Sequence, residues 1–379
     1  MHFFVEGKAD VAIDGSSLSA PASFGNLPDG RTVKVVRIAN CNGVEARILT
    51  WGATLQSLIV PEAFTRPVDV VLGYPDMGGY LKDSAYLGST IGRVSNRIAN
   101  GRIYLDGVWY ELIRNCGNYT LHGGASGFNS EIWDIVSIDS RSVRLAMVSP
   151  DGDQGFPGTL RVEAEFRIDD RNRLHISYFA RTDRPTVVNL TNHTYWNVFG
   201  VDQPGRAIDQ TLQVNADHFL PTGTDAIPTG EVRAVDASPF DLREPVPISD
   251  AISSQDPQIN ASNGLDHSWV LNGGDLGRIS DELPFAAALR DPASGRGLEF
   301  HTNQPAMQIY SGNHLNSARK GKYGQHYRAR HGIALEPHGY PDSPNQPGFP
   351  SIRLNPGEVY KNLTCVALTG VSGAIAARR

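Results

Sequence analysis

The sequence predicts an all-β protein, folded as a large, mostly antiparallel β-sandwich. Apolar residues recur at every second position through most of the chain, and long stretches with the helical period of about 3.6 residues are nearly absent. The 39 glycines and 24 prolines separate short strands from one another. Because strands and helices do not alternate along the chain, a doubly wound parallel sheet is disfavoured.

The first strands are expected over residues 33–40, 44–51 and 53–61, and turn residues separate them: an Asn-Gly pair at Asn42 and a glycine at Gly52. The clearest hairpin follows over 101–112, where Asp-Gly can adopt the positive φ angles of a type I′ turn between two aromatic-rich strands. Similar strands are expected over 142–149, 160–168, 174–181, 285–291 and 297–303.

Two segments, 201–257 and 339–356, are rich in proline, glycine and aspartate, and we expect long ordered loops there. A scaffold of rigid strands would use such loops to build a binding surface. The sequence shows no internal repeat and no linker. One domain is therefore expected over residues 1–379, with roughly the first 20 residues as an N-terminal extension.

The composition is that of a soluble globular protein, with 40% hydrophobic and 20% charged residues. The net charge of −6 arises without a basic cluster, so neither nucleic acid nor a membrane is an expected partner. Three distant cysteines, Cys41, Cys116 and Cys365, suggest free thiols in a reducing compartment. Since the sequence shows neither a signal peptide nor a stretch as apolar as a membrane span, we expect a cytoplasmic protein.

Motifs for phosphate loops, serine nucleophiles and zinc proteases (G-x-x-x-x-G-K-S/T, G-x-S-x-G and H-E-x-x-H) are absent from the sequence. Cofactor-free chemistry, or no chemistry, remains, and no cofactor is expected. His326, His331 and His338 invite a metal interpretation, but their spacing matches no compact ligand set. We therefore expect no metal site.

Four segments carry polar residues where sandwich strands should continue with apolar ones. These segments are 92–102, 121–124, 189–197 and 333–351. In the third, Asn189, Asn192, His193 and Tyr195 are too polar for a core strand unless they line a cleft. In the last, Glu336 ends an apolar run, and a carboxylate so placed must be paired or functional.

Taken singly, these residues have structural explanations. His193 could be a structural hydrogen-bonding residue, and His122 could belong to a turn. Arg97 could form an ion pair, and Asp266 could cap a turn. Together they provide a proton donor, a carboxylate, an arginine, an aspartate and several amides, which are the groups needed to hold hydroxyls and move protons at a sugar hemiacetal.

The same segments, in the same order, resemble the galactose mutarotase (aldose 1-epimerase) family over nearly the whole chain. The resemblance runs through FGNLPDGRTVKVVRIAN, TWGATLQSLIVP, DVVLGY, IGRVSNRIANGR, LHGG, NLTNHTYWN, LDHSWVL, MQIYSGN and LEPHGYPDSPNQPGFPSIRLNPGEVY. It implies the family's large β-sandwich, of the galactose mutarotase-like supersandwich type. It also implies a cofactor-free isomerase that interconverts the α and β anomers of free aldoses such as glucose or galactose.

By position, the resemblance makes His193 of the NLTNH match the general acid and Glu336 of the LEP match the general base. This scheme requires a charged histidine beside a charged glutamate at neutral pH, and it predicts a bell-shaped pH profile. The residues that the resemblance assigns to the sugar's ring oxygen and hydroxyls are Asn96, Arg97, His122, Asp266 and Gln308.

The chain departs from the family's pattern at two positions. His338 stands two residues after the glutamate, where glutamine is usual, and Trp196 stands where phenylalanine is more common. We expect these departures to affect loop packing or substrate range rather than the chemical step. Tyr195, Trp196 or another aromatic residue could stack on the apolar face of the sugar.

Other functions stay open at this point. A hexose-6-phosphate 1-epimerase would need additional basic residues, and none cluster near these motifs. A non-catalytic sugar-binding protein could use the same sandwich, but the presence of both His193 and Glu336 favours catalysis. A glycoside hydrolase would need two carboxylates in equivalent settings, which we do not find in the sequence. The preferred sugar, and the choice between a monomer and a homodimer, are not determined by the sequence.

Overall fold

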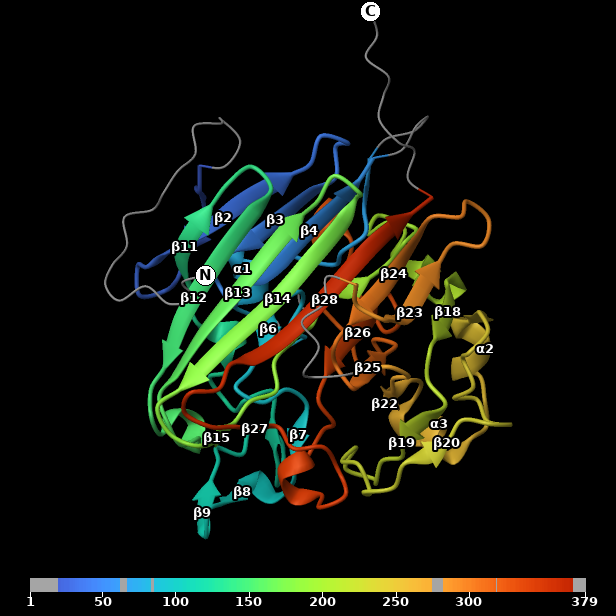
Figure 1. Ribbon diagram of the computed structural model, residues 1–379. Coiled ribbons are helices and arrows are strands. Elements are labelled where there is room, and N and C mark those ends of the chain that lie inside the picture. The colour runs from blue at the N-terminus through green and yellow to red at the C-terminus, as the bar shows by residue number, and fades with distance from the viewer. Residues whose placement is uncertain (1–19, 62–66, 83–84, 275–281, 318, 371–379) are drawn as a thin grey trace, which may run out of the picture.

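The largest sheet has nine strands and crosses the front of the molecule in Figure 1. The computed structural model describes residues 20–61, 67–82, 85–274, 282–317 and 319–370. All neighbouring strands of this sheet are antiparallel. In spatial order they are β11 (Asp134–Ile138), β12 (Ser142–Ser149), β13 (Leu160–Ile168), β14 (Arg173–Thr182), β28 (Tyr360–Thr369), β24 (Gly297–Thr302), β23 (Phe285–Arg290), β18 (Thr211–Val214) and β21 (Val246–Pro247).

Two further sheets form the second layer of the sandwich. A five-stranded sheet contacts β12 and β13, and a six-stranded sheet contacts β28 (Figure 1). The first runs in the order β1 (Ala22–Asn26), β2 (Thr32–Ala39), β3 (Glu45–Leu49), β4 (Thr54–Val60) and β5 (Val68–Asp69). The second runs in the order β17 (Tyr195–Trp196), β26 (Ile333–His338), β25 (Ala306–Tyr310), β22 (Asp266–Val270), β19 (His218–Leu220) and β20 (Arg233–Ala234).

The two sheets of the second layer are joined by a short stretch of backbone pairing. Val71 and Trp196 form an antiparallel bridge, and the Leu72 N–H donates to the Tyr195 carbonyl over 3.0 Å. The second layer is therefore nearly continuous from the five-stranded sheet into the six-stranded sheet. This junction lies next to the segment that carries His193.

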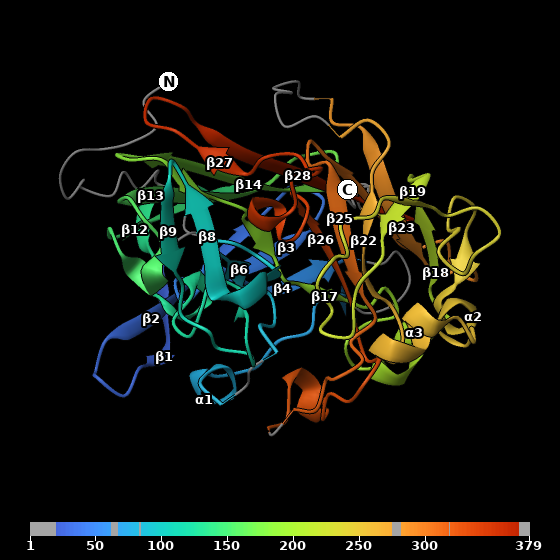
Figure 2. The ribbon, with the colours of Figure 1, turned by 90° about the horizontal axis from the view of Figure 1, so that it is seen from below.

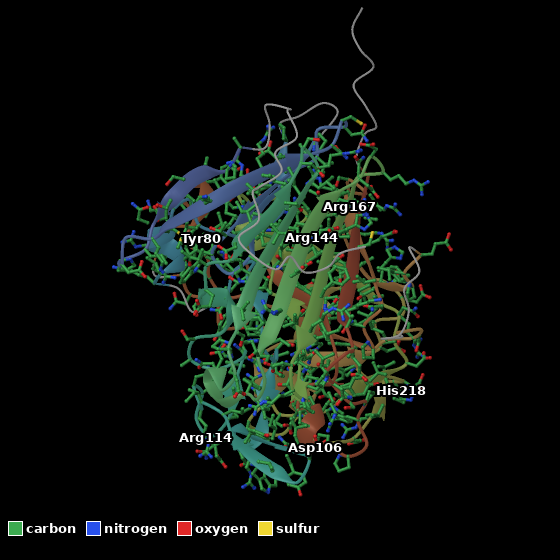
Figure 3. The ribbon with its side chains drawn as sticks, turned by 60° about the vertical axis from the view of Figure 1, so that its left-hand side comes forward. Tyr80, Asp106, Arg114, Arg144, Arg167 and His218 are labelled. Atoms are coloured by element: carbon green, nitrogen blue, oxygen red, sulfur yellow. The ribbon has the colours of Figure 1, made fainter. Side chains whose placement is uncertain are left out.

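Short elements surround the sandwich (Figure 2). The hairpin of β8 (Arg102–Leu105) and β9 (Val108–Glu111) extends beyond one end of the sandwich, with Asp106 at its turn (Figure 3). The short pairs are β6 (Thr90–Ile91) with β16 (Thr191–Asn192), β7 (Arg97–Ile98) with β10 (Thr120–Leu121), and β15 (Thr186–Val187) with β27 (Arg353–Leu354). The α-helices are α1 (Met77–Tyr80), α2 (Ile248–Ile252) and α3 (Pro257–Ser262). Within the described ranges, no helix has the length and apolar character needed to cross a membrane.

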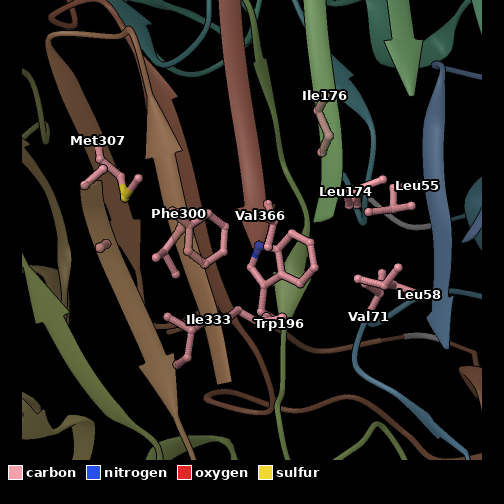
Figure 4. Packing of buried hydrophobic residues seen from close by; sticks show 14 of the residues in the cluster. Leu55, Leu58, Val71, Leu174, Ile176, Trp196, Phe300, Met307, Ile333 and Val366 are labelled. Carbon is pink, nitrogen blue, oxygen red and sulfur yellow. The ribbon is translucent and has the colours of Figure 1, made fainter. Parts of the chain in front are cut away.

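The hydrophobic core lies between the two layers. Trp196 from β17 packs edge-on against Phe300 from β24, with ring centroids 5.5 Å apart, and Ile333 and Val366 lie beside them (Figure 4). Each such side chain contributes about 1.5–3 kcal/mol when it is fully buried. The cluster takes residues from Val36 to Leu368, which favours a single domain, although that interpretation stays a prediction. The expected N-terminal extension lies outside the described residues, apart from its last position.

The predicted all-β sandwich is confirmed, and the strands expected from the alternating pattern are present. The prediction of a loop over 201–257 is wrong in part. β18 lies inside the nine-stranded sheet, between β21 and β23, and β19 lies inside the six-stranded sheet. These strands have 4 and 3 residues, which is too short to show a period of two among prolines, glycines and aspartates.

Candidate active site

A cavity of about 250 Å³ lies on the face of the six-stranded sheet that points away from the core. All seven residues predicted from the sequence line it, although they come from distant parts of the chain. The predicted residues are Asn96, Arg97, His122, His193, Asp266, Gln308 and Glu336. The other residues that line it are Ala85, Tyr86, Leu121, Tyr195, Tyr310, His314, Leu315 and Asn316.

Because successive side chains of a strand alternate between the two faces of the sheet, the six-stranded sheet contributes residues to the core on one face and to the cavity on the other. In β26, Leu335 joins the core cluster whereas the next residue, Glu336, lines the cavity. In β25, Ile309 joins the core whereas Gln308 and Tyr310 line the cavity. Successive side chains of a strand point to opposite faces. The antiparallel register then places Gln308 directly beside Glu336.

His193 is held by its own backbone between β16 and β17. Its N–H donates to the Ser89 carbonyl over 2.9 Å, and its carbonyl accepts from the Gly88 N–H over 3.0 Å. Its Nε2 lies 3.6 Å from Glu336 Oε1, and both side chains are at most 5% exposed. This separation is longer than an ordinary N–H···O hydrogen bond, so each group can turn its proton or lone pair toward a ligand.

Burial dominates the titration of this pair. It lowers the pKa of His193 to about 4, and it raises the pKa of Glu336, with a smaller contribution from the negative charge of Asp266. Both directions stabilise the uncharged forms, a neutral imidazole and a protonated carboxyl group, relative to the charged pair. The expected charged pair has the same total number of protons but places the shared proton on the histidine instead.

The wall formed by β7 and β10 depends on left-handed backbone conformations. Asn96 and His122 have φ angles of 60° and 52°. They bind each other reciprocally, because the His122 N–H donates to the Asn96 carbonyl over 2.9 Å and the Asn96 N–H donates to His122 Nδ1 over 3.3 Å. Gly123 follows with φ +88°, and a Cβ there would lie 1.9 Å from the Gly92 carbonyl oxygen. Only glycine fits, which explains the first glycine of LHGG.

The opposite wall carries Asp266 and Gln308 on the adjacent strands β22 and β25. Gln308 Nε2 donates to Asp266 Oδ1 over 2.6 Å. Burial opposes the charge of Arg97, but the nearby Asp266 carboxylate and a hydrogen bond to Tyr119 outweigh it and raise the Arg97 pKa. Arg97 therefore remains charged at neutral pH, and together with the neighbouring Asp266 it provides directional contacts for hydroxyl groups.

Aromatic rings surround the two central imidazoles. The ring centroids of Tyr86 and His122 lie 4.7 Å apart, and those of His193 and Tyr195 lie 5.0 Å apart. Tyr195 lines the cavity whereas Trp196 is in the core, so Tyr195 rather than Trp196 is in a position to contact a ligand. Tyr86, Tyr310, His314 and Asn316 were not identified from the sequence. Tyr310 had a usable signal, since it lies two residues after Gln308 on the same strand face.

Among the residues that the structure describes, no group of three or more His, Cys, Asp and Glu side chains could hold a metal ion. Of the three histidines considered from the sequence, His338 is fully buried at the end of β26, His326 is exposed, and His331 is partly exposed.

The sequence matches the family model described as aldose 1-epimerase over residues 34–365. Galactose mutarotase from Bos taurus is 40% identical over 344 residues, covering 90% of this chain and 96% of the relative. The chain belongs to the aldose 1-epimerase family. Aldose 1-epimerase from Escherichia coli strain K12 is 36% identical over 339 residues, covering 89% and 95% of the two chains. As a member of this family, the chain is an isomerase and an aldose 1-epimerase.

Solved structures of aldose 1-epimerase relatives share the fold. The aldose epimerase homologue from C. elegans superposes with a TM-score of 0.80 at 30% identity, covering 90% of this chain and 100% of the other. Galactose 1-epimerase from Lactobacillus acidophilus gives a TM-score of 0.77 at 29% identity, covering 92% and 98%. The galactose mutarotase-like sandwich expected from the resemblance is therefore confirmed.

The two departures from the aldose 1-epimerase pattern lie in strands, and His338 contacts Ser95 in the irregular segment before β7. The expectation that they affect loop packing or substrate range stays a prediction. Trp196 is 1% exposed in β17 and packs on Phe300 in the core. His338 is 0% exposed at the end of β26. Trp196 and His338 belong to the strands β17 and β26. The prolines and glycines that follow His338 hide the end of β26 in the sequence pattern.

Proposed function

We propose that the protein exchanges the α and β anomers of a free aldose such as glucose or galactose, with His193 and Glu336 as the proton-transfer pair. The observation that carries this proposal is the approach of a buried imidazole and a buried carboxyl group to 3.6 Å at the cavity. The names of the relatives, galactose mutarotase and aldose 1-epimerase, support the substrate class.

In the proposed reaction, the Glu336 carboxylate takes the proton of the C1 hydroxyl while the His193 imidazolium donates a proton to the ring oxygen. The C1–O5 bond breaks and the C1 carbonyl forms, which gives the open-chain aldehyde. After rotation about C1–C2, His193 takes back the O5 proton, Glu336 returns its proton to the carbonyl oxygen, and the ring closes with the other configuration. Each group typically contributes about 10²–10⁴-fold to the rate.

The neutral pair that burial favours corresponds to one stage of the proposed reaction. A neutral His193 and a protonated Glu336 are the state that accompanies the open-chain aldehyde. When the closed sugar is bound, the shared proton must be on His193, and Arg97 stabilises the Glu336 carboxylate because its charge opposes the rise of that pKa. Burial therefore favours the neutral pair that accompanies the ring-opened stage over the charged pair that starts the reaction.

The remaining predicted residues are proposed to hold the sugar. Asn96, Arg97 and His122 form one wall of the cavity, and Asp266 and Gln308 form the other. Hydroxyl recognition requires such directional groups, because an apolar wall discriminates poorly between hydroxyl positions. We propose that Tyr195, whose ring lies beside His193, contacts the apolar face of the sugar.

The charge of the cavity favours an unphosphorylated sugar over a hexose 6-phosphate. Its lining contains two acidic residues, Asp266 and Glu336, and one arginine, Arg97. The Arg97 charge is already balanced by Asp266. A phosphate carries a charge of about −1.5 to −2 at neutral pH, and the described residues of the cavity lining include no lysine and no second arginine to bind it.

Polarimetry tests the proposed function. Freshly dissolved α-galactose and α-glucose should relax to their anomeric equilibrium faster with the purified protein than with buffer alone. Glucose 6-phosphate should be accelerated much less than glucose. No acceleration of either free sugar would contradict the proposed activity, and a strong preference for the phosphate would replace the proposed substrate class.

We also propose a cytoplasmic location and a monomeric or homodimeric state. Cys41, Cys116 and Cys365 are all free, which suits a reducing compartment. Cell fractionation and light scattering of the purified protein test the two points separately. Recovery with membranes, or a larger assembly in solution, would contradict them.

A further inference from the structure

A buried histidine that the proposed reaction does not use lies beside the cavity, on the same face of β26 as Glu336. His338 ends β26 and is 0% exposed. Its Nδ1 lies 3.2 Å from Ser95 Oγ, and its Nε2 lies 3.3 Å from Ser268 Oγ. Ser95 directly precedes Asn96 on one wall of the cavity, and Ser268 lies on β22 with Asp266 on the other wall. The imidazole therefore bridges the two walls.

The hydrogen bonds of this cluster run in one direction. Ser268 Oγ donates to Gln308 Oε1 over 2.5 Å, and Gln308 Nε2 donates to Asp266 Oδ1 over 2.6 Å. A hydroxyl has one proton to donate, so Ser268 must accept from His338, whose Nε2 carries the hydrogen. Burial lowers the pKa of His338 to about 3. The ring is therefore neutral at physiological pH, and its Nδ1 accepts from the Ser95 hydroxyl.

We propose that His338 is a positioning residue that fixes the orientation of the Gln308 amide in the substrate cavity. The chain of bonds from Ser95 to Asp266 holds Gln308 with Oε1 toward Ser268 and Nε2 toward Asp266. A reversed amide would place its oxygen 2.6 Å from the Asp266 carboxylate oxygen, and two acceptors repel at that distance. The inference rests on the proposed function, because it takes Gln308 to be a sugar-binding residue.

The same geometry explains how this chain can have histidine where its family usually has glutamine. In the inferred tautomer, the imidazole accepts a hydrogen bond at one end and donates one at the other. A glutamine side chain also has one acceptor and one donor end. Either residue can therefore connect Ser95 to Ser268 with the same polarity. Leucine has a similar volume but can make neither bond.

The kinetic test compares His338→Leu with His338→Gln, using α-galactose. In His338→Leu, the KM should rise about fivefold to tenfold, the factor that corresponds to one net hydrogen bond of about 1 kcal/mol, while kcat changes less than about twofold. In His338→Gln, the KM should stay within about twofold of the wild-type value. An unchanged KM in folded His338→Leu, or an equal rise in His338→Gln, would overturn the proposal.

Two further variants separate positioning from general stability. Ser268→Ala removes the hydroxyl that links His338 to Gln308, so it should raise the KM as His338→Leu does. It leaves the imidazole in place and therefore tests the proposal even where the leucine variant does not fold. Combining the two changes should raise the KM no further than either alone, because both remove one connected chain. An additive effect would contradict a single chain. His218→Leu, an exposed substitution in β19 of the same sheet, is the matched control and should leave the KM unchanged.

Nitrogen-15 NMR tests the direction of the chain without any activity measurement. The imidazole signals that disappear in His338→Gln should show a protonated Nε2 and a bare Nδ1, unchanged from about pH 5 to pH 8. The opposite tautomer, or titration within that range, would overturn the inferred polarity. A wild-type protein without mutarotase activity would contradict the proposed function, whereas the NMR result would still decide the orientation of the chain.

Discussion

The substitution Glu336→Gln tests the proposed chemistry and its electrostatic setting in one variant. Glutamine keeps the volume of the side chain but cannot take a proton from a hydroxyl. Asp266, the other acidic residue of the cavity, is bound by Gln308 over 2.6 Å and is not free to replace it. We expect kcat to fall about 10²–10⁴-fold, which corresponds to about 3–5 kcal/mol of transition-state stabilisation.

The same variant should be more stable than the wild type above the unfolded pKa of the carboxyl group. Burial raises the Glu336 pKa above its ordinary value of 4.5. As the pH rises past 4.5, the unfolded chain releases this proton while the folded chain retains it, so the wild-type free energy of unfolding falls. Glutamine has no proton to release, so this loss is absent from the variant.

Polarimetry after subtraction of the spontaneous reaction measures the first effect, and thermal melting across pH 4 to 8 measures the second. The melting temperature of Glu336→Gln minus that of the wild type should increase with pH above about 4.5. Wild-type kcat in the variant would refute the role of the carboxylate as base. A difference in melting temperature that does not grow with pH would refute the argument that burial raises its pKa.

Three other predictions follow from the same structure. The kcat/KM of the wild type should decline on the acid side with a midpoint near the His193 pKa of about 4, and a midpoint near 6.5 in a folded protein would contradict the burial argument. Leu335→Ala, on the core face of β26, should cost about 2–5 kcal/mol in chemical denaturation while kcat is retained; a selective loss of kcat would show that the face assignment is wrong. Lys322 Nζ lies 2.6 Å from Asp69 Oδ2 with both side chains buried, so Lys322→Met should cost about 3–5 kcal/mol. Adding Asp69→Asn should recover much of that loss, and no recovery would argue against an unpaired carboxylate as its cause.

The sequence was most informative where a polar residue interrupts an alternating strand. Glu336 after an apolar run and His193 after Val187 and Val188 stand out for this reason, and the structure places both at the cavity. The alternation of β26 also assigns faces, because Leu335 and Glu336 must point to opposite sides of the sheet. Strand patterns therefore predicted the sandwich and two central residues of the site from local information.

Contacts between distant irregular segments could not be predicted in this way. Tyr86, His314 and Asn316 reach the cavity from segments without a period, and nothing local distinguishes them from surface residues. The connection of Ser268 to His338 depends on the register of β22, β25 and β26, which is set by the whole sheet. Burial is likewise a property of the folded chain, so the sequence suggested an ordinary charged pair where burial favours a neutral one.

The arrangement of the six-stranded sheet shows how a buried polar site can coexist with a stable fold. A buried polar group without a hydrogen-bond partner costs about 1–3 kcal/mol, whereas a fully buried aliphatic side chain contributes about 1.5–3 kcal/mol. In β25 and β26 these two kinds of residue alternate, so each polar residue toward the cavity is next to an apolar residue in the core. The rows across the strands then satisfy the polar groups, since Ser268 bonds Gln308 and lies opposite it in the register. Stability and chemistry are thus assigned to opposite faces of the same strands, and a change on one face can be made with little effect on the other.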